Sequence, residues 1–229
     1  MGQKTIYLIR GSKNESYQAF RSRILDMLQQ VLDNHKPASL WVTMTVERPP
    51  RRSVIPFRKA KIAAVSIKTD QRSLVGELIS LPGFSGAYRV EEAIPVSHEP
   101  YWPDGTPTPG VNLLTLFQRK PGISREQFLD RWHNSHTPLS LRIHPLWNYN
   151  RNVVMERLTA ESPGYEGIVE EQMRTREDLL NPFRFFGNPL VILPRMLAVY
   201  TDTKAFLDYK KIETYLAEEI ILKSQVVRW

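Results

Sequence analysis

The sequence predicts an α+β protein in which two tandem ferredoxin-like βαββαβ units pack together as one α+β barrel. The same order of strand and helix patterns occurs twice, once on each side of a segment rich in proline and glycine. The 229 residues also suffice for two units of about 110 residues each. In such a unit, two helices cover one face of a four-stranded antiparallel sheet, and the other face stays apolar until a second sheet covers it. Two units in one chain can therefore meet sheet to sheet and close a barrel.

The first unit is expected over residues 1–96 and begins with the strand KTIYLIR. Asn14 or Ser16 then caps a helix, because apolar residues from Tyr17 to Val31 recur at the spacing of one helical face. Pro37 ends this helix. Within residues 39–47, aliphatic side chains or methionine at the even positions alternate with tryptophan or threonine at the odd positions, which is the period of a half-buried strand. The remaining patterns predict a strand over 61–68, a short helix over 73–81 and a strand over 86–96.

Residues 97–110 hold four prolines and two glycines and are expected to form a linker. The second unit, residues 111–229, repeats the order with a strand over 111–119 and a helix that begins at a capping box of Ser124 and Gln127. Strands are expected over 148–156 and 164–172, and a short helix over 174–181. We expect the last strand over 195–201 and a terminal helix over 204–223.

Composition excludes several classes of protein. The chain has no cysteine, so disulfides, thiolate metal sites and cysteine nucleophiles are excluded. No apolar run approaches the roughly 18 residues of a membrane span, and the N-terminus lacks the features of a signal peptide, so we expect a cytoplasmic protein without membrane contact. The net charge is +7, and six basic residues without an acidic one lie within 48–61. Because this stretch contains three prolines and no nucleic-acid motif accompanies it, we interpret it as a solvated loop.

Residues 118–154 contain a strand ending in Arg-Lys-Pro-Gly at 119–122, then Phe128, then Trp132 with His136 four residues on, followed by Pro138. In these features the segment resembles the EthD family. The segment Tyr-Glu-Gly-Ile-Val-Glu at 165–170 is similar to a strand of that family, and residues 206–208 and 218–219 are similar to its C-terminal signature. The match extends from about 111 to 226, and the first half matches by architecture alone.

This resemblance implies membership of the dimeric α+β barrel superfamily. Its members share a fold and differ in chemistry: they include cofactor-free cyclases, dehydratases, isomerases and monooxygenases as well as haem-dependent enzymes. The resemblance therefore implies a site inside the barrel without fixing the reaction.

His136 is the main candidate for a catalytic base. It shares a helical face with Trp132 and Phe128, and an aromatic wall favours the neutral imidazole that a general base requires. The alternative is a structural histidine at the end of the helix. His133 points about 100° away on the helix, and the His-x-x-His spacing is not that of a zinc helix, so we expect no metal site.

The other candidates complete an acid–base site. Arg142 or Tyr149 would hold an oxyanion and Glu170 would act as an acid, although solvated surface or an ion pair is the alternative for each charged group. Arg151 and Glu166 are weaker candidates of the same kinds. The residues expected to bind substrate are Trp132, Phe128, His144, Tyr101, Trp102 and Tyr165.

We therefore expect a cofactor-independent lyase that dehydrates, or cleaves by retro-aldol chemistry, a hydrophobic phenolic or polyketide-like small molecule. Such a reaction needs a base, an oxyanion holder and an acid, and no cofactor. One alternative is a haem- or oxygen-dependent oxidoreductase of the same superfamily, with His136 or His144 as axial ligand. A second alternative is a non-catalytic module that binds anions through its basic loop. We expect a homodimer that binds no nucleic acid.

Overall fold

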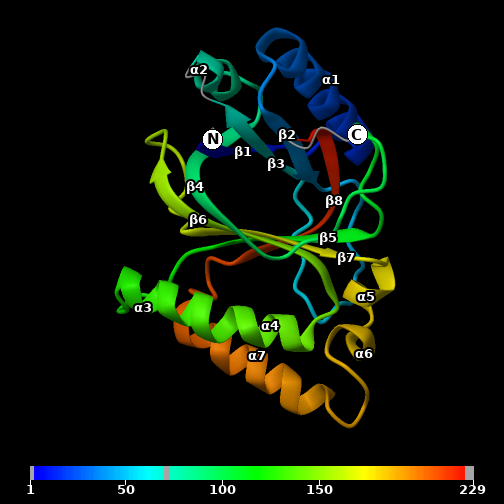
Figure 1. The fold of residues 1–229 in the computed structure, drawn as a ribbon, viewed down its shortest axis with the longest axis vertical. Coiled ribbons are helices and arrows are strands. Elements are labelled where there is room, and N and C mark those ends of the chain that lie inside the picture. Colours follow the sequence, from blue (N-terminus) through cyan, green and yellow to red (C-terminus); the bar gives the residue numbers. More distant parts are fainter. Residues whose placement is uncertain (1–2, 70–72, 225–229) are drawn as a thin grey trace.

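The computed structural model describes residues 3–69 and 73–224. Eight antiparallel strands close into one barrel in the order β1-β3-β2-β8-β5-β7-β6-β4 (Figure 1). The strands are β1 (Gln3–Arg10), β2 (Ser39–Met44), β3 (Ile62–Thr69), β4 (Phe84–Val96), β5 (Val111–Phe117), β6 (Leu146–Arg157), β7 (Gly167–Met173) and β8 (Glu213–Lys223). Strands β1–β4 come from the first half and β5–β8 from the second. The pairs β2–β8 and β4–β6 join the halves, and the predicted fold class is confirmed.

The helices form two layers outside the barrel. Helices α1 (Tyr17–His35) and α2 (Ser73–Ile79) cover the first half, and α3 (Arg125–Asp130), α4 (Thr137–Ile143) and α7 (Ile192–Phe206) cover the second (Figure 1). A π-helical turn, η1 (Arg131–His136), joins α3 to α4, and α5 (Arg176–Leu180) and α6 (Pro182–Phe185) follow β7. The predicted caps at Ser16 and Ser124 are both present. None of the helices in the described ranges is long and apolar enough to cross a membrane.

Two predicted elements near the C-terminus are wrong. Residues 195–201 lie within helix α7 and form no strand, and the segment predicted as a helix over 204–223 contains strand β8. The apolar spacing in β8 was ambiguous because this strand is buried on both faces. Tyr215 and Ala217 face the barrel interior, while Leu216 and Ile220 pack under the helices. A strand buried on both sides shows no alternation, so a helical period fits it by chance.

The barrel interior is filled. Apolar side chains such as Ile6, Leu8 and Ile168 occupy it together with buried polar groups. The Lys4 ammonium lies 2.8 Å from Glu92 Oε1, 2.7 Å from Asn152 Oδ1 and 3.7 Å from Glu170 Oε2. These contacts pair groups of both halves across the interior, which matters because an unpaired buried charge is costly.

Candidate active site

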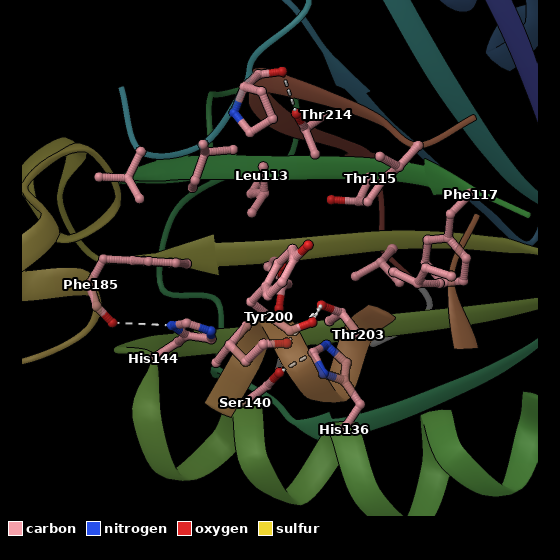
Figure 2. A pocket seen from close by; sticks show the side chains of 18 of the residues that line it. Leu113, Thr115, Phe117, His136, Ser140, His144, Phe185, Tyr200, Thr203 and Thr214 are labelled. Atoms are coloured by element: carbon pink, nitrogen blue, oxygen red, sulfur yellow. Dashed lines mark hydrogen bonds between the residues drawn. The ribbon is translucent and has the colours of Figure 1, made fainter. Parts of the chain in front are cut away.

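The main pocket lies outside the barrel, between the outer face of the second-half sheet and the helices that cover it. The cavity is about 470 Å³, and strands β5, β7 and β8 form one wall while α4 and α7 form the other (Figure 2). We expected the site between the two sheets, and that expectation is wrong. The interior contains its own polar network and apolar core, so the cavity lies on the other face of the same sheet.

The helical wall carries residues spaced four apart: Phe128, Trp132, His136, Ser140 and His144. Four residues overshoot one α-helical turn by about 40°, so this spacing would drift around a regular helix. The wider turn η1, over Arg131–His136, offsets that drift and keeps the row directed at the sheet. Turns of this type occur frequently at functional sites. The row begins with the apolar aromatic side chains of Phe128 and Trp132 and continues with polar ones. The polar side chains all line the cavity.

His136 is held by an acidic partner on the neighbouring helix. Its Nδ1 lies 2.8 Å from Oδ2 of Asp202 in α7, and both side chains are largely buried. Because a carboxylate only accepts hydrogen bonds, we assign the proton to Nδ1, which leaves a lone pair on Nε2. Ser140 Oγ lies 3.2 Å from Nε2, on the pocket side of the helix (Figure 2). This arrangement fixes the orientation of the imidazole and directs Nε2 to the pocket wall, where an unprotonated Nε2 can accept a proton.

Asp202 itself is stabilised as an anion. Burial raises its pKa, but hydrogen bonds from His136 and Ser135 outweigh this effect and leave the pKa below its ordinary value. The carboxylate therefore stays charged at neutral pH and keeps the His136 ring in one orientation and tautomer.

His144 also lines the pocket and is neutral. Burial lowers its pKa to about 4, and its Nδ1 lies 3.1 Å from the backbone oxygen of Phe185, to which it donates. The ring stacks on Phe185 with centroids 4.0 Å apart. Its position suits a residue that shapes the pocket and presents an unprotonated Nε2.

The sheet wall contributes a buried acid and a phenol. Glu171 on β7 is 9% exposed, and its cross-strand partner on β6 is Tyr149, which is 1% exposed. Burial raises the pKa of Glu171 to about 7. Burial and then the neighbouring Glu171 raise the pKa of Tyr149 to about 12. Near neutral pH the Tyr149 phenol is therefore protonated and Glu171 is protonated in part, and both groups lie at the cavity wall.

The rest of the lining is uncharged and mostly apolar, with hydroxyl groups of threonine and tyrosine among the apolar side chains. The described residues around the cavity include no lysine or arginine, and Glu171 is their one carboxylic acid. Residues 54–56 of the β2–β3 loop, from the first half, reach the pocket, and Phe57 forms a bridge with Thr214 of β8. A lining of this kind suits a neutral, hydrophobic ligand and gives an anionic ligand no ionic partner.

Four of the predicted site residues line this pocket: Trp132, His136, His144 and Tyr149. Phe128 is fully buried behind them, with its ring 5.6 Å from that of Trp132. The structure thus brings together the predicted base, one predicted oxyanion holder and part of the predicted aromatic wall. Their catalytic roles remain predictions.

The other predicted residues lie elsewhere. Glu170 and Tyr165 face the barrel interior, on the opposite side of the sheet from the cavity, where Thr43 donates a 2.5 Å hydrogen bond to Glu170. Arg142 is exposed on α4, and Tyr101 is 77% exposed. Trp102 is buried in a separate aromatic cluster with His98 and Trp147.

The weaker candidates have structural partners. Arg151 donates to Thr137 and lies over the Trp132 ring, and Glu166 forms ion pairs with Arg119 and Arg125. In the described ranges, no three histidine or acidic side chains group as a metal site would require.

Sequence reasoning missed Glu171, Asp202 and Ser140. Glu171 follows Glu170 directly, and the period of a strand puts the two on opposite faces, so the predicted Glu170 faces the barrel interior and Glu171 faces the pocket. Ser140 continues the four-residue row from Phe128, a signal that was visible in the sequence. Asp202 directly follows the segment predicted as a strand over 195–201. That segment lies within helix α7, so the contact between Asp202 and His136 was not predicted.

These features define a closed α+β barrel with a pocket under the helices of its second half. Residues 120–185 match the model of the EthD domain, which confirms the resemblance of the second half to this family. No curated protein matches the chain.

Two solved structures share the fold. An anthrone oxidase-like protein has a TM-score of 0.58 and 9% identity over 100% of this chain and 96% of its own. A candidate monooxygenase from Fusobacterium nucleatum subsp. nucleatum has a TM-score of 0.51 and 10% identity over 96% of this chain and 92% of its own. At this identity the similarity shows the fold alone.

Proposed function

We propose that this protein is a cofactor-independent lyase that removes a proton from a neutral, hydrophobic ketone or phenol. The observation that carries the proposal is His136, whose Nδ1 is bound to Asp202 and whose Nε2 is directed toward the pocket. The substrate class follows from the lining, which is mostly apolar and lacks lysine and arginine among the described residues. A fused aromatic ketone with two or three rings suits a cavity of about 470 Å³.

In this reaction His136 accepts a proton from the carbon next to the carbonyl. The negative charge that develops on the carbonyl oxygen requires a donor, and the protonated Tyr149 phenol on the sheet wall can supply it. The enolate then expels a leaving group at the next carbon. Asp202 stabilises the imidazolium that forms on His136.

The test uses 1-tetralone, a two-ring ketone whose C2 protons exchange with D₂O when a base removes them. We expect the protein to catalyse this exchange, measured by NMR, and His136→Ala to lower the rate by about 10²–10⁴, the usual contribution of general acid–base catalysis. Asp202→Asn should lower it by about 10²–10³, because it disturbs the tautomer of His136.

His133→Ala is the matched control for this experiment, because His133 is in the same turn and does not line the cavity. Equal losses in His133→Ala and His136→Ala would contradict the proposal. So would a His136→Ala protein that keeps its exchange rate.

A second candidate is oxidation by molecular oxygen, favoured by the names of the two structural neighbours. It shares the first step, since a carbanion formed by His136 is also the species that would meet oxygen. Oxygen uptake with anthrone, a three-ring ketone with an acidic CH₂, distinguishes this candidate from elimination. Haem fits the pocket poorly, because its two propionates find no lysine or arginine among the described lining residues.

A further inference from the structure

Glu171 is a buried carboxyl group for which the fold supplies no partner. It is nine-tenths buried and lines the cavity, yet the hydrogen bonds and ion pairs among the described residues include none to its side chain. The neighbouring Glu170 contrasts with it, because Glu170 accepts hydrogen bonds from Thr43 and Asn152 and lies near the Lys4 ammonium. Buried polar groups are nearly always paired with protein or water, so a carboxyl group without a protein partner at a cavity wall is available to a polar group of a ligand.

The two walls of the cavity divide the acid from the base. His136 is on the helical wall, whereas Glu171 is on the sheet wall, next to Tyr149. Figure 2 shows this layered arrangement, with the strands that carry Leu113 and Thr115 on one side of the pocket and His136 with Ser140 on the other. A flat ligand between the layers therefore presents one face to His136 and the other to Glu171.

We propose that Glu171 is the general acid that protonates the departing hydroxyl group, from the substrate face opposite to His136. This inference rests on the proposed function, and it names the substrate class more closely: a neutral β-hydroxyketone fused to an aromatic ring. Burial favours the protonated carboxyl that this role requires at neutral pH.

The proposed reaction is a dehydration, in which the β-hydroxyketone loses one molecule of water. The electron pair of the C2–H bond first passes into the enolate, and it then forms the C2–C3 double bond as the C3–O bond breaks. The C2 proton goes to Nε2 of His136, and the hydroxyl group takes a proton from Glu171 and leaves as water. Solvent exchange then returns the proton from His136 to Glu171. Because acid and base act on opposite faces, the elimination is anti.

The probe is 3-hydroxy-1-tetralone, which loses water to give fluorescent 1-naphthol after tautomerisation. We expect Glu171→Gln to lower this dehydration by about 10²–10³, while C2 exchange of 1-tetralone falls less than tenfold because no hydroxyl group leaves. Glutamine has the size of glutamic acid and cannot deliver a proton, so the variant should keep its melting temperature at or above that of the parent. Glu177→Gln, the same change at an exposed site on α5, is the control and should alter neither rate.

Stereospecific deuterium at C2 tests the geometry directly. Wild-type protein should remove the label that lies trans to the hydroxyl group and retain the one that lies cis, as mass spectrometry of the naphthol reports. Loss of the cis label would overturn the placement of acid and base on opposite faces.

The outcomes separate the two proposals. If 1-tetralone exchanges and 3-hydroxy-1-tetralone is not dehydrated, the base assignment stands and the role of Glu171 is wrong. Equal losses of both rates in Glu171→Gln would also overturn it, since Glu171 would then act on the carbonyl oxygen or in binding. If wild-type protein catalyses neither reaction, the proposed function itself fails, and the inference fails with it.

Discussion

The two halves of the barrel share one basic order of strands and helices, yet α1 packs an apolar row on its sheet whereas the helices of the second half enclose a cavity. In the first half, Phe20, Ile24, Leu28 and Val31 of α1 fill the space against the sheet, and all are at most 1% exposed. In the second half, the equivalent row begins with Phe128 and Trp132 and continues with His136 and Ser140. Polar side chains in place of long apolar ones within one helical row leave a cavity for a ligand between helices and sheet. This difference requires no change in the strands of the barrel.

The largest difference should appear when side chains are truncated in the two layers. Leu28→Ala should lower the free energy of unfolding by about 2–5 kcal/mol, because it opens a cavity in a close-packed core. Met196→Ala, at the wall of the existing cavity, should cost less than ~1 kcal/mol, since the residue already borders empty space. Denaturant unfolding of both variants measures the two values, and equal costs would show that the layers are packed alike.

The pH dependence of stability offers a second test. Burial raises the pKa of Glu171 and of Glu219 to about 7, above the ordinary value of 4.5. The unfolded chain therefore releases these protons at lower pH than the folded protein, and stability falls as pH rises from about 4.5 to about 7.

Glu171→Gln and Glu219→Gln should each remove part of this pH-dependent loss of stability. Each variant should be more stable than wild type above pH 7, by about 1–3 kcal/mol, and close to it below pH 4.5. Thermal unfolding across this range measures the effect. A bound neutral ligand should reduce the gain in stability of Glu171→Gln, because Glu171 lies at the pocket. The gain in stability of Glu219→Gln should not change, because Glu219 lies inside the barrel, where Thr108 donates a hydrogen bond to its carboxyl group. The same gain with and without ligand would argue against contact between ligand and Glu171.

The smallest expected effect comes from filling the cavity. Thr115→Leu adds apolar volume on the sheet wall, so the affinity for 1-tetralone should fall about tenfold, which corresponds to ~1.4 kcal/mol, while the melting temperature stays the same or rises. Thr115→Val, which loses the hydroxyl group without adding volume, separates the two causes. Calorimetric titration gives both affinities. Unaltered affinity in Thr115→Leu would place the ligand away from β5.

The architecture could be predicted because its signals are local and repeated. The caps at Ser16 and Ser124 are properties of short segments, and both occur where they were expected. The alternation over 39–47 correctly indicated strand β2, although this strand is buried on both faces and not half-buried. Strand β8 and helix α7 could not be distinguished by pattern, because a strand covered on both faces and a half-exposed helix both contain scattered apolar residues.

The lining of the pocket could be predicted in part for a related reason. His136 was chosen because the helical row and the resemblance both indicated it, and it lies at the pocket wall. The carboxyl group at the pocket is that of Glu171 and not the predicted Glu170, because no local signal shows which face of a sheet adjoins a cavity. That choice depends on Lys4, Glu92 and Asn152, which occupy the barrel interior and come from strands far apart in the sequence.

The shared ring of strands makes the two halves mutually dependent. Each half alone would expose two unpaired sheet edges, at β2 and β4 or at β8 and β6. Glu170 would also lose Thr43 and Lys4, its partners from the first half. If the chain were divided between residues 97 and 110, neither piece should fold alone, and the two should reassemble when mixed. Because two copies of the first half would bring two Lys4 ammonium groups together without Glu170, the buried charges also disfavour pairing of identical halves.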